Sequence, residues 1–468
     1  MQPQLVEHPQ LGTGKLLKTY MGGYEWEVEF DSGRRFRLPA REFEIETVTI
    51  WQQSQPPAAS PLTQSRPVVL DRDQFRARQT LEALRFGIVP VQDVETLTIG
   101  LEAESVSLNR ALARSKERGG DVQAVIGDYG FGKSHFIELA ARRALRENFI
   151  VATASLDLLE VPPGKPLEIY RALTAAMRYP DSHERGLRPL FAKVQENPSA
   201  VRQFVGQSPI PDFCPLSIAV SAAADCATQA AYDDLILWIS GHIKPTADLK
   251  SCIRKPPSLY AVGEVARQYS YLLTGISVLA TLFGYSGLAI LIDESEHYSL
   301  LRARQRGRAD AFFQAMICGA LGFNNGRIDP NHIPEHARAD YPVMFASNPH
   351  LFFLFALTES ENRMPVDSWL APTQIVRLDD RFIEKDIRKF FNTLLDYHGL
   401  AYGYTFDNGR YSEVLSAMPG LLSRALSQHR INLRELIRTA VTVCDLLYLH
   451  DDYLPGVAMQ EVAQGLNM

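Results

Sequence analysis

Short apolar runs alternate with helical patterns from about residue 72 onward. Continuous apolar runs are typical of strands buried on both faces, and such strands occur in parallel sheets that helices cover. The strand candidates are Val122 to Ile126, Phe149 to Leu156, Leu288 to Ile292, Leu351 to Leu357 and Gln374 to Leu378. The pattern therefore predicts an α/β fold with a mostly parallel sheet.

Helical periodicity fills most of the remaining chain. It predicts a mostly helical insertion over about residues 157–286 and a helical lid over residues 380–468. The stretch from Tyr271 to Ile292 is uncharged and about as long as a membrane span, but Gly284 to Gly287 interrupts it. A buried helix, a tight turn and a core strand explain this stretch better. The lid helices are expected at Glu384 to His398, Gly409 to Ala417 and Asn432 to Leu449.

The start of the chain follows a different pattern. Short segments rich in β-branched, aromatic or alternating residues are separated by glycine-containing turns, which predicts a small all-β barrel over residues 1–50. Residues 51–71 are rich in Pro, Ser and Gln and predict a flexible linker, because they cannot bury a core. The barrel strands are expected at Lys15 to Thr19, Glu25 to Phe30 and Arg35 to Leu38.

Composition narrows the class of protein. The 468 residues are 46% hydrophobic and 22% charged, which is ordinary for a globular chain with a full core. The net charge of −6 argues against nucleic-acid binding by bulk electrostatics. No basic and apolar leader follows Met1, so a cytoplasmic location is expected. The cysteines are scattered, which predicts free thiols: Cys214, Cys226, Cys252, Cys318 and Cys444.

The segment from Gly127 to Ser134 reads GDYGFGKS and matches the phosphate-loop pattern G-x-x-x-x-G-K-[ST]. A strand candidate precedes it and an amphipathic helix follows, as the chemistry requires. Glycines let backbone N–H groups surround phosphates, Lys133 would contact the β- and γ-phosphates, and Ser134 would bind Mg²⁺. The residues expected to contact ATP are Gly127, Asp128, Tyr129, Gly130, Phe131, Gly132, Lys133, Ser134 and His135.

Two acids, Asp293 and Glu294, end the apolar strand candidate that begins at Leu288. The carboxyl ends of parallel strands share one edge of the sheet, so these acids are expected beside the phosphate loop. Asp293 would hold Mg²⁺ and Glu294 would polarise the attacking water in ATP hydrolysis. Acids at strand ends also serve as helix caps, and Glu296 is an alternative base.

Further candidates come from later segments. Thr358 follows a strand candidate and is a candidate to orient the lytic water, although an ordinary strand-to-loop transition explains it equally well. Arg363, with Arg381 as a second choice, is a candidate arginine finger acting in trans, with an ordinary surface arginine as the alternative. Arg434 near the start of a lid helix is a candidate nucleotide contact, with a solvated helix face as the alternative.

The surroundings of these motifs resemble a known family. The segments ALRFGIVP (from Ala83), GDYGFGKSH (from Gly127), GYSGLAILIDE (from Gly284) and NLRELIRTAV (from Asn432) are similar to those of the BREX-system ATP-binding proteins, which in turn resemble initiator-type AAA+ ATPases. The similarity covers roughly residues 75–455. It implies an AAA+-like P-loop core over residues 72–379, sensor roles for Thr358 and Arg434, and adenine contact near Ile88 to Ile99. Residues 432–434 read Asn-Leu-Arg where the family more often has Pro-Arg, and the barrel resembles SH3- or Tudor-like tails.

The sequence is compatible with three functions. The resemblance implies an ATP-hydrolysing motor or switch in bacterial anti-phage defence, working with a protein partner such as a helicase or another subunit. DNA contact, direct or through that partner, and a homo-oligomer are left open. A replication-initiator-like DNA loader is the second hypothesis, and its usual winged-helix domain is not seen before Met468. An ATP-binding regulator with little turnover is the third.

Overall fold

The computed structural model consists of two compact units. The first contains the described parts of residues 1–46, 104–126 and 140–377, and the second those of residues 47–103, 127–139 and 378–468. The described residues are 5–8, 11–20, 25–39, 71–210, 214–259, 265–322, 327–336, 339–379, 384–405, 408–427, 432–450 and 452–465. The expected linker over residues 51–71 lies outside them except for Asp71, and so does Arg381.

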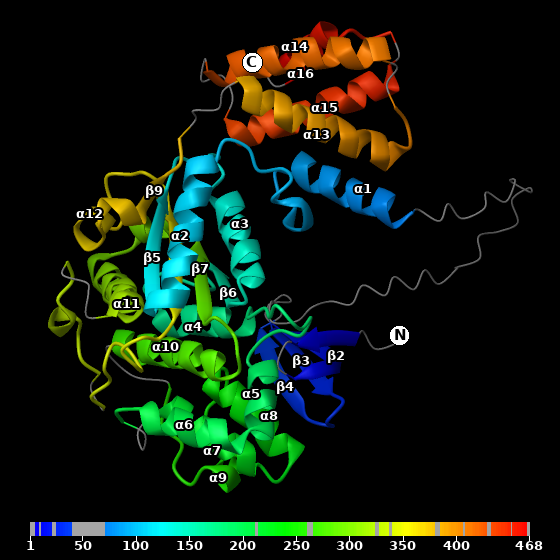
Figure 1. The fold of residues 1–468 in the computed structure, drawn as a ribbon. Coiled ribbons are helices and arrows are strands. Elements are labelled where there is room, and N and C mark those ends of the chain that lie inside the picture. Colours follow the sequence, from blue (N-terminus) through cyan, green and yellow to red (C-terminus); the bar gives the residue numbers. More distant parts are fainter. Residues whose placement is uncertain are drawn as a thin grey trace, which may run out of the picture. The chain divides into compact units, whose positions relative to one another are not determined.

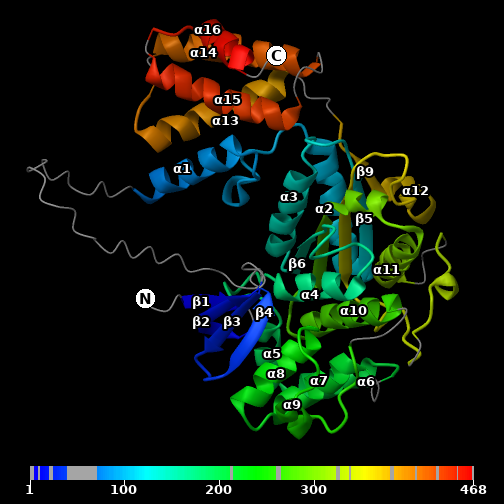
Figure 2. The same cartoon turned by 180° about the vertical axis from the view of Figure 1, so that it is seen from behind.

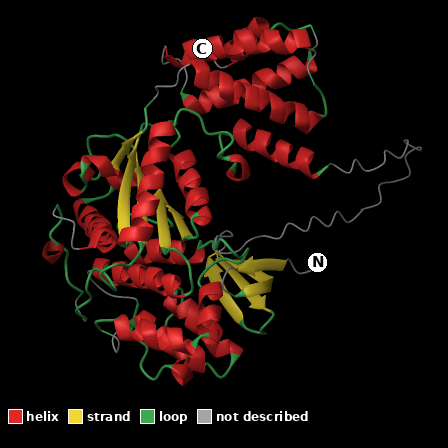
Figure 3. Ribbon diagram, in the orientation of Figure 1, coloured by secondary structure: helices red, strands yellow, loops and turns green. Residues whose placement is uncertain are grey.

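A five-stranded sheet forms the centre of the first unit (Figures 1 and 3). Its order is β6-β7-β8-β5-β9, and every neighbouring pair is parallel. The strands are β5 (Gly120–Ile126), β6 (Ile150–Ser155), β7 (Leu288–Asp293), β8 (Leu351–Leu357) and β9 (Ile375–Arg377). The predicted parallel α/β fold is confirmed, and β8 is buried along its whole length because helices leave neither face to solvent.

Helices cover the sheet and extend below it (Figures 1 and 2). On one side, Gln123 of β5 donates to Ser107 of α2 at 2.9 Å. The helices and 3-10 turns of this unit are α2 (Glu102–Arg118), α4 (Pro166–Ala175), α5 (Arg188–Glu196), α6 (Pro198–Gln207), α7 (Pro215–Asp225), α8 (Gln229–Ile239), α9 (Ala247–Cys252), α10 (Ala266–Leu282), η4 (Ser295–Leu300), α11 (Ala303–Leu321), η6 (Pro330–His332), α12 (Val366–Trp369) and η7 (Pro372–Gln374). The predicted helical insertion is thus confirmed as α4 to α10.

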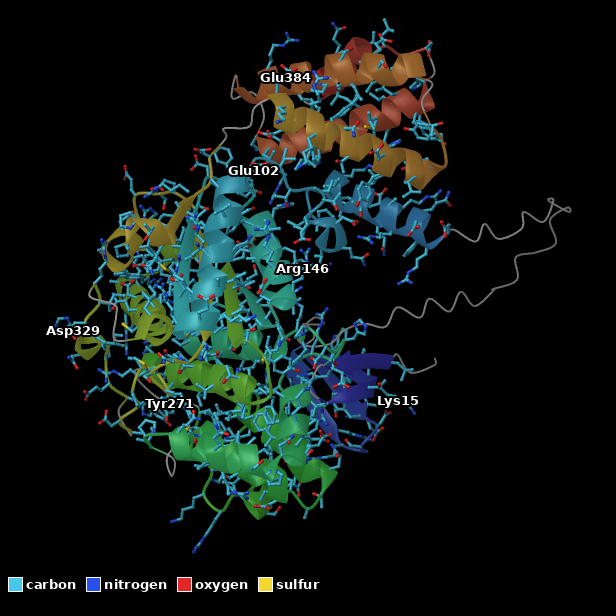
Figure 4. All side chains as sticks on the ribbon, in the orientation of Figure 1. Lys15, Glu102, Arg146, Tyr271, Asp329 and Glu384 are labelled. Carbon is cyan, nitrogen blue, oxygen red and sulfur yellow. The ribbon has the colours of Figure 1, made fainter. Side chains whose placement is uncertain are left out.

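The uncharged stretch from Tyr271 to Ile292, about as long as a membrane span, consists of a buried helix, a turn and a strand. It forms most of α10, a turn and β7, as predicted, and no helix in the described part of the chain is long and apolar enough to cross a membrane. Tyr271 of α10, labelled in Figure 4, shares a hydrogen bond of 2.8 Å with Ser208. Gly287 has a φ of +130°, and a Cβ there would lie 1.9 Å from the carbonyl oxygen of His350. A glycine is therefore required where β7 enters the sheet.

A four-stranded antiparallel sheet begins the first unit: β1 (Leu5–His8), β2 (Gly12–Tyr20), β3 (Glu25–Phe30) and β4 (Arg35–Pro39). Its core consists of Val6, Val28, Phe30 and Leu38. The turn before β4 contacts the insertion, where Arg34 donates to the carbonyl of Ala230 at 2.6 Å and to Asp234 at 3.0 Å. The predicted strands are confirmed, whereas this docking was not foreseen.

The second unit is mainly helical. It comprises α1 (Arg72–Arg85), η3 (Val91–Asp93), the start of α3 (Lys133–Arg146) and four further helices. These four helices, which we call the lid, are α13 (Glu384–Tyr402), α14 (Asn408–Ser427), α15 (Leu433–Leu449) and α16 (Pro455–Gly465). Buried apolar residues of α1 and of all four lid helices form one core. His398 contacts the Tyr404 hydroxyl at 2.7 Å and Asp445 at 3.0 Å, and Asp445 also accepts from Arg85. This network joins α1, α13 and α15.

The cysteines agree with the prediction of free thiols. Cys214, Cys226, Cys252, Cys318 and Cys444 are all unbridged.

Candidate nucleotide site

The phosphate loop, residues 127–132, runs from the end of β5 to the start of α3. Gly130 and Gly132 have φ values of +86° and +84°, in the left-handed region that side chains other than glycine resist. A Cβ on Gly127 would lie 3.1 Å from Cβ of Leu378. The glycines of the motif are thus required both by backbone conformation and by close packing.

Lys133 is 7% exposed although it carries an ammonium group. Its Nζ donates to the carbonyl oxygens of Gly127 and Asp128, at 3.0 and 3.1 Å. A buried ammonium is stable only with such acceptors. Because these carbonyls belong to the loop itself, the lysine lies over the loop that it follows.

The first residues of α15 contact the phosphate loop, within the second unit. The Arg434 Nη1 donates to the Tyr129 hydroxyl at 2.7 Å, and its guanidinium carbon lies 5.0 Å from the centre of the Tyr129 ring. Asn432 caps α15 by accepting from the Glu435 N–H at 2.9 Å. A Cβ on Gly130 would lie 3.1 Å from Cγ of Asn432, so these two residues pack closely.

His135 extends the phosphate-loop motif into α3. Its Nε2 shares a hydrogen bond of 2.8 Å with Oγ1 of Thr98, which also donates to the carbonyl of Val94 at 2.6 Å. Burial lowers the pKa of His135 to about 4. The imidazole is therefore neutral at physiological pH, and it joins the segment before α2 to the base of the phosphate loop.

The acids lie at the end of β7, in the first unit. Asp293 is the last residue of the strand, and its Oδ1 accepts from the N–H of Glu294 at 2.9 Å. Glu294 has a φ of +56°, a left-handed conformation uncommon for a residue with a side chain, and its carboxylate is 50% exposed. Oε2 of Glu296, the alternative base, is buried and has no hydrogen-bond partner within the described residues.

The pairing of β8 with β5 and with β7 aligns the carboxyl ends of these three strands. Leu357 of β8 pairs with Ile126, the residue before the phosphate loop, and Phe355 pairs with Ile292, the residue before Asp293. The strands are parallel, so their carboxyl ends lie at one edge of the sheet. Thr358 follows β8 at this edge, and its Oγ1 is buried with no hydrogen-bond partner in the described chain. An unsatisfied buried hydroxyl of this kind is suited to a bound water or ligand.

Comparison with known proteins identifies the segment that carries the loop. Residues 73–197 match the family described as BREX system ATP-binding protein BrxC/D. The predicted resemblance is thus confirmed over a segment that includes the phosphate loop, α3 and β6. A Walker-type ATPase of Pyrococcus abyssi is similar in structure at 13% identity with a TM-score of 0.33, covering 79% of this chain and 74% of that chain. No curated protein matches the chain.

Arg363 lies in a cluster of charges after β8. Its Nε donates to Glu359 at 3.0 Å and its Nη2 to Asp367, while Arg377 pairs with the same two acids at 3.0 Å each. Its side chain is 14% exposed. The hydrogen bond from Arg363 is the main cause that lowers the pKa of Asp367. The proposed finger is thus engaged within its own chain.

Several contacts of the site were missed by sequence reasoning. Gly87, in the ALRFGIVP segment, has a φ of +69°, and a Cβ there would lie 3.0 Å from the Arg434 side chain. Tyr129 likewise contacts Arg434, and Asn432 packs on Gly130, although the two residues of each pair are far apart in the sequence. The positive φ of Gly87 has a sequence signal, a glycine just after a helix, but no local pattern indicates which distant arginine fills the space above it.

Proposed function

We propose that this chain binds and hydrolyses ATP as a P-loop ATPase of an anti-phage defence system. The observation that carries the proposal is the buried Lys133, held over a glycine loop that directly follows a strand of the parallel sheet. The family match over residues 73–197, which names an ATP-binding protein of the BREX system, also supports ATP binding by this chain. Backbone N–H groups of the loop and the N-terminus of α3 would bind the phosphates.

Mg²⁺ is the metal that this chemistry requires, and oxygen donors suit it. The Ser134 hydroxyl and the Asp293 carboxylate would hold it, with water and phosphate oxygens completing the shell. No group of three or more His, Cys, Asp or Glu side chains fit to hold a metal occurs among the described residues. Mg²⁺ on a nucleotide is usually bound by one or two protein oxygens. The ion would supply charge neutralisation between the phosphates.

The remaining residues take the roles that the sequence suggested. Glu294 would orient and deprotonate the attacking water, and the buried hydroxyl of Thr358 would help to position it. Arg434 would pair with the terminal phosphate from the lid. Arg363 would act on a neighbouring copy, which requires that it leave Glu359 and Asp367.

The ATPase would act as a motor or switch in the cytoplasm, with a protein partner that acts on DNA. A ring or other homo-oligomer is part of this proposal, and a measurement of mass in solution with and without ATP and Mg²⁺ tests it. Identification of a protein that co-purifies with the full chain from cells tests whether such a partner exists.

The central test separates binding from turnover. We expect wild-type protein to bind ATP, Lys133→Ala to lose that binding, and Glu294→Gln to bind ATP while turnover falls at least a hundredfold. Turnover should rise with duplex DNA or the partner. Retained ATP binding in Lys133→Ala would contradict the proposal. Binding without turnover under every condition would leave an ATP-dependent regulator in place of the motor.

A further inference from the structure

Arg434 is held on the phosphate loop by a residue within that loop. Tyr129 follows Gly127 by two positions, and its hydroxyl accepts the Arg434 Nη1–H at 2.7 Å. The guanidinium also lies over the ring face, 5.0 Å from its centre. One side chain therefore makes two distinct contacts with the same cation, a hydrogen bond and a cation–π interaction.

The aliphatic stem of Arg434 packs closely on Gly87. A Cβ added there would lie 3.0 Å from both Cγ and Cδ of the arginine, so the aliphatic stem passes directly over the glycine. Arginine is long and loses about 2 kcal/mol of rotamer entropy when fixed. Contacts with Tyr129 and Gly87 restrict it in advance, which reduces the entropy lost on binding an anion.

Solvent exposure gives a reason to assign a role to Tyr129. This residue is 64% exposed, so it contributes little to the core, although aromatic residues are usually at least partly buried. Its hydroxyl is hydrogen-bonded to Arg434, which lies 305 positions later in the chain. The tyrosine thus connects the loop expected to bind phosphates to the first turn of a lid helix.

We propose that Tyr129 is a positioning residue that holds Arg434 ready for the terminal phosphate of ATP. Tyr129 acts through the arginine, by fixing the direction of its guanidinium, and makes no contact with the reacting atoms itself. The inference rests on the proposed function, since it requires ATP on the loop. It follows that Tyr129 favours ATP over ADP, because ADP lacks the phosphate that Arg434 would contact.

A binding experiment with a fluorescent ATP analogue and the matching ADP analogue tests this proposal on the full chain. Tyr129→Phe keeps the ring and removes the acceptor, and we expect its Kd for ATP to rise about threefold. Tyr129→Ala removes both contacts and should raise that Kd about tenfold. The Kd for ADP should stay within a factor of two in both variants. Arg438→Ala, an exposed arginine one turn further along α15, is the matched control and should bind like wild type.

A double-mutant cycle decides whether the tyrosine acts through the arginine. In an Arg434→Ala background, Tyr129→Phe should have no further effect on ATP binding. An unchanged Kd for ATP in Tyr129→Ala, an equal loss for ATP and ADP, or a full effect in the Arg434→Ala background would each overturn the proposal. Absence of ATP binding in the wild type would instead refute the proposed function, and this inference with it. Circular dichroism and thermal midpoints of the variants identify any loss of fold.

Discussion

Arg34 of the N-terminal sheet and Asp234 of α8 form an ion pair with two N–O distances of 3.0 Å, and the aspartate side chain is fully buried. Asp234 also accepts a hydrogen bond from Thr246, and Arg34 reaches Asp248 at 3.2 Å. Arg34, in a tight turn of the small sheet, thus neutralises the buried carboxylate of Asp234 inside the helical insertion. Among the described residues of that sheet, four buried apolar side chains form its core, and we therefore expect its stability to depend on this docking.

We expect Arg34→Ala to loosen the N-terminal sheet. Removal of one partner leaves a buried carboxylate unpaired, which costs about 3 kcal/mol. Hydrogen exchange of the amides in β3 and β4, followed by mass spectrometry, should accelerate about a hundredfold. Arg35→Ala is the control, because Arg35 is 60% exposed and pairs with Glu29 inside the sheet. Equal exchange rates in the two variants would show that the ion pair does not hold the sheet in place.

The left-handed backbone conformation of Glu294 leads us to expect that the residue best for stability at this position differs from the one best for activity. Its φ of +56° costs about 1 kcal/mol for a residue with a side chain, and glycine removes that cost. We expect Glu294→Gly to raise the thermal midpoint or leave it unchanged while abolishing ATP turnover, and Glu294→Gln to change turnover alone. Calorimetry and phosphate release measure the two effects. A clear fall in the midpoint of Glu294→Gly would show that the carboxylate is needed for folding.

His135 predicts a pH dependence of stability. Its pKa is about 4 in the folded protein, below the value of about 6.5 for an unburied imidazole. Between these values the unfolded chain binds more protons, so stability is fully present above pH 6.5 and is lost as the pH falls toward 4. The loss should be no more than about 3 kcal/mol. Thermal midpoints across this range should vary less in His135→Gln, and an identical pH profile in that variant would contradict the assignment.

We expect Arg363 to contribute more to stability than its neighbour Arg377. The two arginines share Glu359 and Asp367, but their side chains are 14% and 53% exposed. We expect Arg363→Ala to cost about 1 kcal/mol of stability and Arg377→Ala less, because solvent screens the exposed pair. Thermal melting measures this order, and the reverse order would contradict it. If Arg363 also serves as a finger in trans, mixing Arg363→Ala with Glu294→Gln protein should restore part of the turnover.

The parallel sheet, the helical insertion and the phosphate loop were predictable because their signals are local. Apolar runs such as Leu351 to Leu357 identify buried strands by themselves, and GDYGFGKS specifies its glycine conformations within eight residues. The Glu294 conformation was not predictable, since a left-handed glutamate has no composition signal. The partners of Arg363 lie within a short stretch, yet the sequence did not reveal that they engage its guanidinium.

The sequence by itself determined that this chain has an α/β core with a phosphate loop and two acids at a strand end. Periodicity and motif spacing encode these features in consecutive residues. Only the tertiary structure decided that Arg34 pairs with Asp234, that Tyr129 holds Arg434, and that Thr98 meets His135. Each of these pairs joins residues far apart in the chain, and their choice of partner depends on how whole helices and strands pack, because side-chain hydrogen bonds and ion pairs carry no sequence period of their own.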